Sequence, residues 1–227
     1  MEERKHTSTQ YEKELQEIKN NLIYLGALTE QAIQKAMKSL IDRDTEMANK
    51  VIANDYEIDK MDKEIEEKCI KLLALRQPTA IDLRFIATAI KINGHLERIG
   101  DMAVNIAEKA AQLNQEPKLK PYIDLPRMSS IVENMVAKAL ESLIKRDLHL
   151  ADEVREIEQV VDDLNEQIFR ELLTFMMEDS KSIHRALLIM HVSKNLERIA
   201  DHAQGIADMV TYMITGENIR HIEKVTK

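Results

Sequence analysis

The chain of 227 residues is long enough for one large or two small domains, and 44% of its residues are hydrophobic while 32% are charged. With five Gly, four Pro and no Trp, this composition is typical of long helices that expose charged faces. The formal net charge of −8, with no basic cluster to offset it, argues against binding to nucleic acid or directly to an anionic membrane.

The cysteine count and the apolar runs bear on the compartment. Cys69 is the single cysteine, so an intramolecular disulfide is excluded and a reducing compartment is favoured. Its spacing from Ile65 and Leu72 predicts a packed side chain on the buried side of a helix rather than a reactive thiol. The first ten residues lack the apolar core of a signal peptide, and the longest apolar run, residues 186–190, is too short to span a membrane. We therefore expect a cytoplasmic protein.

The apolar spacing predicts two long helices in the first third of the chain. Residues 11–41 carry apolar side chains near one side of a helix. Asp44 is a suitable N-cap for the next helix, since its carboxylate can accept hydrogen bonds from free backbone N–H groups. That helix is expected to stop at Gln77, because Pro78 restricts the residue before it and cannot donate to the helical ladder.

A third helix, the most regular of the chain, is predicted after this turn. Thr79 followed by Asp82 resembles a capping box, with Asp in place of the usual Glu. Beyond it, apolar residues alternate steps of four and three, which predicts a seam packing at a shallow angle on neighbouring helices. The seam residues are Phe85, Ala89, Ile92, Leu96, Ile99, Ala103, Ile106, Ala110 and Leu113. Three of the four prolines follow within residues 117–126 and mark a linker.

The second half of the chain repeats the first. Residues 95–108 (HLERIGDMAVNIAE) and 195–208 (NLERIADHAQGIAD) are identical at eight of fourteen positions, and residues 30–44 align with 133–147 at an offset of 103. A last helix from about Ser182 carries the same four-three seam. The predicted fold is all-α, with two tandem three-helix bundles related by an internal repeat. Its predicted segments are an N-terminal tip at 1–10, bundles at 11–114 and 127–216, a linker at 115–126 and a tail at 217–227.

Pairs of acidic residues four apart recur on the second and third helices of each repeat. They are Asp55, Asp59, Glu97 and Asp101 in the first repeat, and Glu158, Asp162, Glu197 and Asp201 in the second. Two carboxylates at this spacing lie one turn apart on one helix face, where both can reach one cation. Chance alone gives about seven such pairs in a chain this acidic, but not at equivalent positions of a repeat.

Two interpretations of these carboxylates remain open from the spacing alone. An all-oxygen ligand set suits Mg²⁺, Ca²⁺ or Mn²⁺, and carboxylate-bridged iron is compatible with it. The alternative is a solvated acidic face in which Arg98 pairs with Asp101 and Arg198 pairs with Asp201. Helical geometry turns the histidines at positions 95, 191 and 202 away from the carboxylates, so we expect them at the surface or in packing contacts.

The two LERI segments, 96–108 and 196–208, together with residues 76–84 (RQPTAIDLR), resemble the PhoU family of phosphate-transport accessory proteins. The resemblance extends over about residues 11–215. It implies two three-helix bundles whose acid-x-x-x-Asp motifs bind multinuclear metal clusters, commonly of iron or zinc, with Mg, Mn or Ca also compatible. These motifs map onto the eight carboxylates named above. The second repeat departs from the pattern in two places, since residues 178–181 (EDSK) replace the Arg-Gln-Pro turn and Asn165 stands opposite Asp62.

The same resemblance implies a regulator rather than an enzyme. Such a protein links a phosphate ABC transporter, through its ATPase, to a phosphate-sensing histidine kinase and represses the phosphate-starvation response. It is expected to form a homodimer, to bind no nucleic acid and to reach the membrane through its partners only. The absence of a phosphate-binding glycine loop or a nucleophile motif agrees with this expectation. A metal-dependent phosphohydrolase using two metal ions and a plain helical scaffold are the alternatives that the sequence leaves open.

Overall fold

The fold consists of six long helices, and the computed structural model describes residues 9–217. The helices are α1 (Thr9–Ile41), α2 (Thr45–Arg76), α3 (Ala80–Leu113), α4 (Asp124–Lys145), α5 (Leu148–Glu178) and α6 (Ile183–Thr215), with a short 3-10 helix, η1 (Ser180–Ser182), before α6. Within this part of the chain there is no strand, and the predicted all-α class is confirmed. Most of the predicted tip and tail, residues 1–8 and 218–227, lies outside the described residues.

Capping side chains fix where the second helix of each repeat begins. The Asp44 carboxylate accepts a hydrogen bond from the Met47 N–H at 2.9 Å, as predicted. Asp147, its equivalent in the second repeat, accepts from the His149 N–H at 2.9 Å. Helix α2 ends at Arg76, one residue before the predicted stop, and Gln77 takes the left-handed conformation with φ of 45°.

The predicted capping box at the start of α3 is wrong for Thr79, whose side chain makes no capping hydrogen bond. Its hydroxyl instead donates to Asp82 Oδ2 at 3.4 Å, and the Tyr11 hydroxyl donates to the same oxygen at 3.1 Å. Asp82 is only 9% exposed, so these hydroxyl donors compensate for its burial. The residue therefore ties the start of α1 to the start of α3.

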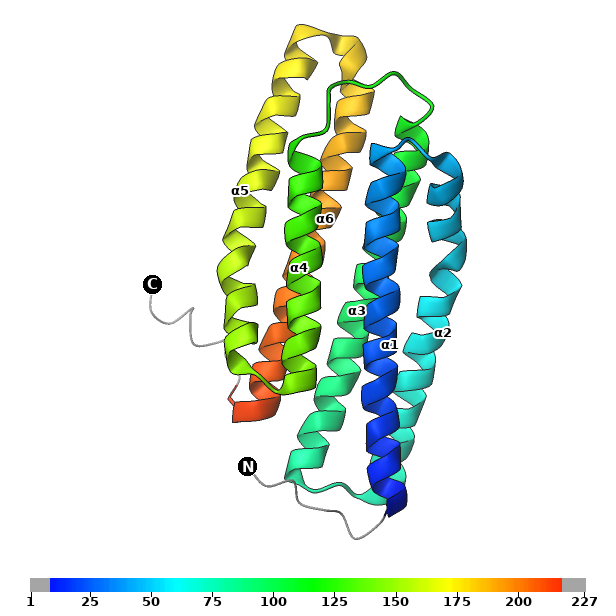
Figure 1. Ribbon diagram of the computed structural model, residues 1–227, viewed down its shortest axis with the longest axis vertical. Helices are drawn as coiled ribbons and strands as arrows, with labels where there is room; N and C mark the ends of the chain where they lie inside the picture. Colours follow the sequence, from blue (N-terminus) through cyan, green and yellow to red (C-terminus); the bar gives the residue numbers. More distant parts are fainter. Residues whose placement is uncertain (1–8, 218–227) are drawn as a thin grey trace.

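The two repeats lie side by side and contact each other through two pairs of helices. Helices α1–α3 form one bundle and α4–α6 the other (Figure 1). Among the described helices, α3 packs on α6 and α1 packs on α4, while α2 and α5 contact only helices of their own repeat. The chain direction in Figure 1 makes both inter-repeat pairs antiparallel. The outer helices α2 and α5 therefore keep one face away from the other repeat.

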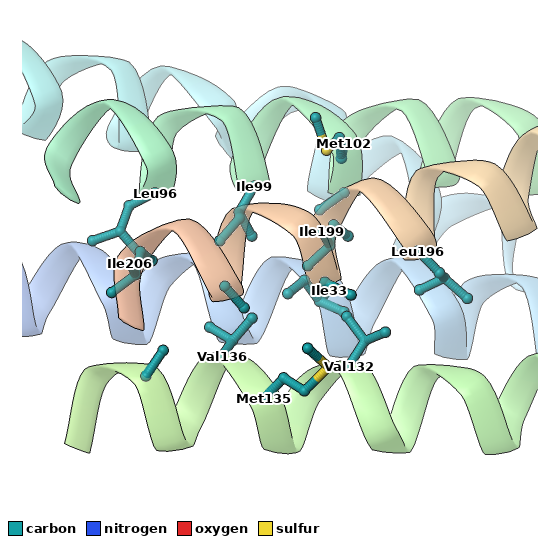
Figure 2. Close-up of a cluster of buried hydrophobic side chains, with 14 of the residues drawn as sticks. Ile33, Leu96, Ile99, Met102, Val132, Met135, Val136, Leu196, Ile199 and Ile206 are labelled. Carbon is teal, nitrogen blue, oxygen red and sulfur yellow. The ribbon is translucent and has the colours of Figure 1, made fainter. Parts of the chain in front are cut away.

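The buried apolar side chains of both bundles form one continuous core. Figure 2 shows Ile33 of α1, Leu96 and Ile99 of α3, Val136 of α4 and Ile199 of α6 meeting between the helices. The predicted α3 seam is buried along its length, apart from the half-buried Phe85. Cys69 is fully buried, as its spacing predicts, and burial raises the pKa of its thiol to about 12.

The connection between the repeats is held by Arg43, which follows α1. The Arg43 guanidinium donates hydrogen bonds to the main-chain oxygens of Asn114 at 2.8 Å and Glu116 at 2.5 Å, just after α3. Helix α4 then begins at Asp124, inside the predicted linker of residues 115–126. Whether this linker separates two independent domains stays a prediction.

Replacing Arg43 by glycine is expected to lower the free energy of unfolding by about 1–2 kcal/mol. Hydrogen bonds from a charged donor contribute about 1.5–3 kcal/mol, and relief of the left-handed backbone (φ of 58°) offsets part of their loss. Arg146 is the matched control, because it occupies the equivalent turn with φ of 52° but has an exposed side chain. Urea unfolding should show that Arg146→Gly is neutral or stabilising, and equal losses at both positions would contradict this role for Arg43.

Candidate metal site

A hydrogen bond between α2 and α3 brings the carboxylates of the first repeat together. The Asn93 amide donates to the main-chain oxygen of Asp62 at 2.9 Å and to its carboxylate Oδ1 at 2.6 Å. Because α2 and α3 are consecutive antiparallel helices, this contact places Asp59 opposite Glu97 one turn further along. The next turn places the remaining pair of this repeat, Asp55 and Asp101, opposite each other.

Electrostatics show that these side chains share one environment. Burial raises the pKa of Asp55, and the charges of Asp59 and Asp101 raise it further. The pKa of Glu97 is raised by burial and by Asp101, against the lowering effect of Arg98, with smaller contributions from Asp62 and Asp59. Burial and acidic neighbours on the two helices therefore disfavour ionisation of Asp55 and Glu97, and the pKa of Asp62 is raised in the same way.

The second repeat places its carboxylates in the same way. The Ser193 hydroxyl of α6 donates to Asn165 Oδ1 of α5 at 2.6 Å, where the first repeat has the Asn93–Asp62 contact. Burial raises the pKa of Asp162, and the Glu197 charge raises it further. The pKa of Asp201 is raised by burial, by Glu197 and by Asp162.

Glu158, the remaining predicted ligand of the second repeat, lies on α5 one turn before Asp162 and is half-buried. The structure thus places all eight predicted positions on the α2–α3 and α5–α6 faces, four in each repeat.

Basic side chains pair with carboxylates on both faces. Arg98 contacts Glu97 Oε2 at 3.4 Å and Asp101 Oδ2 at 3.0 Å, as the solvated-face interpretation predicts for Arg98 and Asp101. In the second repeat the Lys194 ammonium lies 2.6 Å from Glu197 Oε1. Sequence reasoning missed Lys194, as it missed Asn93 and Ser193, although a lysine three residues before a glutamate on a helix is a signal for an ion pair.

The residues fit an oxygen-bound cation in their chemistry. Glu197 Oε2 and Asn93 Oδ1 are buried oxygen atoms with no hydrogen-bond partner, so each has an unused acceptor. Clustered carboxylates and an amide oxygen are the donors that hard cations and carboxylate-bridged iron require. Among residues 9–217, no three Asp, Glu, His or Cys side chains stand in metal-ligating geometry as placed. A bound ion would therefore require side-chain rotation from the present ion pairs.

A cavity of about 480 Å³ adjoins the carboxylates of the second repeat, between α5 and α6. Its walls combine apolar side chains such as Phe169, Leu187 and Met190 with the polar Lys194 and Glu197. His191, which was expected at the surface or in a packing contact, is exposed and also lines this cavity. One edge of the candidate site is therefore open to solvent and partly apolar.

The other two histidines link the repeats instead of facing the carboxylates. His95 Nδ1 of α3 lies 2.9 Å from His202 Nδ1 of α6, with the ring planes inclined at 65°. Gly205 permits this approach, since a Cβ atom there would lie 2.4 Å from His95 Cε1. Both rings take part in the packing of α3 on α6.

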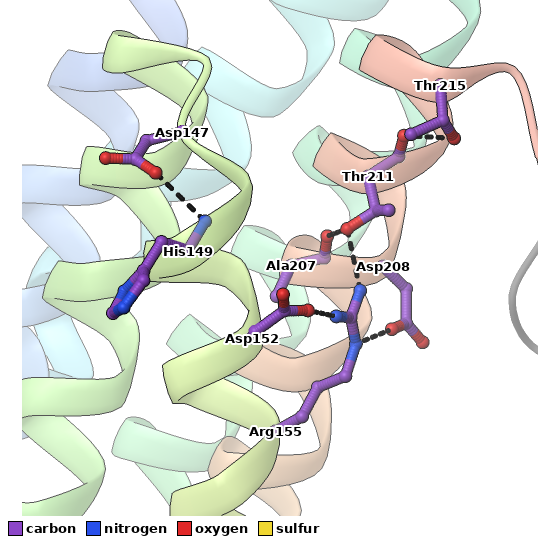
Figure 3. A network of polar contacts seen from close by, with 8 residues as sticks. All are labelled: Asp147, His149, Asp152, Arg155, Ala207, Asp208, Thr211 and Thr215. Carbon is purple, nitrogen blue, oxygen red and sulfur yellow. Dashed lines mark hydrogen bonds and ion pairs between the residues drawn. The ribbon is translucent and has the colours of Figure 1, made fainter.

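A polar network on the second repeat keeps a further acidic side chain paired (Figure 3). The Arg155 guanidinium lies 2.9 Å from Asp208 Oδ1, donates to the Thr211 hydroxyl at 2.7 Å and also contacts Asp152. These contacts join α5 to α6. Ile52 occupies the equivalent position of the first repeat, so this link distinguishes the two halves.

Comparison with known proteins places the chain in a family. The PhoU domain model matches residues 22–110 and 125–210. A Pseudomonas aeruginosa protein named phosphate-specific transport system accessory protein PhoU homolog is 39% identical over 218 residues, covering 96% of this chain and 90% of the relative. The Aquifex aeolicus protein of the same name is 44% identical over 209 residues, covering 92% and 95%.

Solved structures agree in fold. The crystal structure of PhoU from Pseudomonas aeruginosa matches with a TM-score of 0.89 at 38% identity, and the match covers 91% of this chain and 100% of that one. The phosphate transport system regulatory protein PhoU from Streptococcus pneumoniae matches with a TM-score of 0.85 at 28% identity, covering 92% and 99%. None of the helices within residues 9–217 has the apolar length needed to cross a membrane. The chain belongs to the PhoU domain family.

Proposed function

We propose that this chain is an accessory regulator of a phosphate-specific transport system that acts by contact with other proteins. Its family membership supports this role, since relatives 34–44% identical to it are named as accessory proteins of that system rather than as enzymes. The proposed location is the cytoplasm, where the ATPase of a phosphate ABC transporter and a phosphate-sensing histidine kinase are accessible. In this role the protein represses the phosphate-starvation response while phosphate is plentiful.

We further propose that both repeats bind metal. The observation that carries this proposal is the convergence of carboxylates from two helices in each repeat, where burial and acidic neighbours raise the pKa values of Asp55 and Glu97 in the first and of Asp162 and Asp201 in the second. Carboxylates that disfavour one another's ionisation are stabilised by a cation between them. Asp55, Asp59, Glu97 and Asp101 would hold the ions of the first repeat. Their equivalents would hold those of the second.

The bound ions would supply positive charge that fixes α2 against α3 and α5 against α6. Iron and zinc are the family expectation, while the all-oxygen donor set also suits Mn²⁺ and Mg²⁺. We assign no chemical step to these ions, because the proposed role is regulation by contact.

Elemental analysis of protein purified without chelator is expected to find metal, and paired variants should each lower its amount. Glu97→Gln with Asp101→Asn removes ligands of the first repeat, and Glu197→Gln with Asp201→Asn those of the second. Circular dichroism should show that helicity is retained, because these side chains lie beside the core. Unchanged metal content in both variants would leave the acidic faces as solvated surface.

The partner proposal needs a separate test. The purified chain, with and without metal, should capture the transporter ATPase and the sensor kinase in reconstituted binding assays, and size-exclusion chromatography with light scattering should report a homodimer. Failure to bind either partner in any metal state would contradict the adaptor role. Hydrolysis of a phosphoester that is lost in the paired variants would instead support an enzyme.

A further inference from the structure

The two carboxylate faces differ at one position that bears directly on cation binding. Lys194 of α6 aligns with Gly94 of α3 at the repeat offset of 100. The Lys194 ammonium lies 2.6 Å from Glu197 Oε1, whereas Gly94 is exposed and a Cβ added there would meet nothing within 4 Å. The second repeat therefore carries a tethered cation on its face, and the first repeat has empty space at the same place.

A second difference also makes the first repeat more favourable to a cation than the second. Asp62 adds a fifth carboxylate to the first repeat, while Asn165 holds the equivalent position in the second. Arg98 pairs with Glu97 and Asp101 in the first repeat, and the charge of Arg198, at the equivalent position, acts on Asp201 in the second, so an arginine is present on both faces. Asp163 and Glu166 stand where the first repeat has Lys60 and Lys63, a charge difference that favours the second repeat, but both carboxylates bond within α5 to side chains four residues away.

We propose that Lys194 competes with metal for Glu197, so that the first repeat binds metal more tightly than the second. The inference rests on the proposed metal-binding function. The Lys194 ammonium occupies Oε1 of Glu197, and the buried Oε2 has no partner. A cation that binds this carboxylate must displace the ammonium, and the Lys194 side chain, 58% exposed, can turn into solvent. At the first-repeat site the paired basic side chain is Arg98, whose equivalent Arg198 is also present in the second repeat, so Lys194 is an additional competitor there.

Reciprocal substitutions test this competition. Lys194→Met removes the tethered cation while keeping the length and helix propensity of the side chain. Gly94→Lys places a lysine three residues before Glu97, where the open space accommodates it. Titration with Mn²⁺ under calorimetry measures both sites of the full chain. Glu97→Gln with Asp101→Asn, or Glu197→Gln with Asp201→Asn, leaves one repeat intact and assigns each affinity.

The wild-type chain should titrate in two classes, with the tighter one lost when the first repeat is disabled. Lys194→Met is expected to tighten the second-repeat site by about three- to tenfold, the range for one partly exposed charge-assisted contact. Gly94→Lys should weaken the first-repeat site by a similar factor. Lys145→Met is the matched control: Lys145 is 59% exposed and lies 2.5 Å from Glu141, away from both faces, and its loss should leave both affinities unchanged.

The possible outcomes separate this proposal from the one it rests on. If wild-type protein binds no Mn²⁺, Zn²⁺ or Fe³⁺, the metal-binding function fails, and the competition fails with it. If metal binds but the two repeats have equal affinities, the competition alone is overturned. The same holds if Lys194→Met changes the affinity of the second-repeat site no more than Lys145→Met does. Tighter binding in the second repeat of the wild type would reverse the predicted order and overturn it as well.

Discussion

Replacing Ile99 by alanine should lower the free energy of unfolding by about 3–4 kcal/mol, the usual cost of emptying a fully buried isoleucine site. Ile99 has no exposed surface and lies on α3, which packs on α1, α2 and α6. The cavity would therefore open where the two repeats meet (Figure 2). Because one continuous core spans both repeats, we expect them to unfold together in a single transition.

Urea unfolding followed by circular dichroism measures the loss, and hydrogen exchange of α2 and α5 amides tests whether the repeats unfold together. Ile123→Ala is the control, because Ile123 is 73% exposed in the connection between repeats and its truncation should change stability by less than about 0.5 kcal/mol. Protection that persists in α5 after it is lost from α2 would show that the second repeat is stable alone.

Much of this core follows from sequence periodicity. The four-three spacing from Ala89 to Leu113 predicts the buried stripe of α3, and the structure confirms it. The spacing of one helix does not say which neighbours cover its stripe. Gly100, Met102 and Ala107 are buried as well, which widens the apolar face of α3 beyond a single seam. Such a wide stripe is the sequence signal that α3 contacts a second bundle.

The candidate site was predictable in part for a related reason. An i, i+4 spacing within one helix places Glu97 and Asp101 on one face whatever the fold. Their position relative to α2 depends on the register between the helices, and this is fixed by the contact of Asn93 with Asp62. The sequence shows these two residues thirty-one positions apart with no local relation. Periodicity therefore predicts each acidic pair within a helix, but not which face of the neighbouring helix lies opposite it.

The carboxylates of the first repeat should make the metal-free protein less stable at neutral pH than a neutralised variant. In the folded state the pKa values of Asp55 and Glu97 are raised, by burial first and by acidic neighbours second. The unfolded chain has the ordinary values of about 3.9 and 4.3. The folded state thus binds more protons, and stability from these groups is lost as pH rises through their raised pKa values. Asp55→Asn with Glu97→Gln removes this loss.

With a chelator present, this double variant should be more stable than wild type by about 0.5–1 kcal/mol at pH 7 and equally stable at about pH 3, below both unfolded pKa values. Urea unfolding at the two pH values measures the difference. Glu46→Gln with Glu141→Gln is the control, since the exposed Glu46 and the half-buried Glu141 are each paired with a lysine on their own helix. This control variant removes the same charge and should not raise the free energy of unfolding at pH 7. A less stable double variant at pH 7 would show that these carboxylates stabilise the fold without metal.

Adding metal should reverse the order of stability at pH 7. A ligand at about a hundred times its dissociation constant stabilises the folded state by about 2.7 kcal/mol. Wild type gains this at the first repeat, whereas Asp55→Asn with Glu97→Gln has lost two of the proposed ligands and gains little there. The same side chains then lower stability without metal and raise it with metal. Only a binding site predicts this change of sign, because a solvated acidic face would keep one order under both conditions.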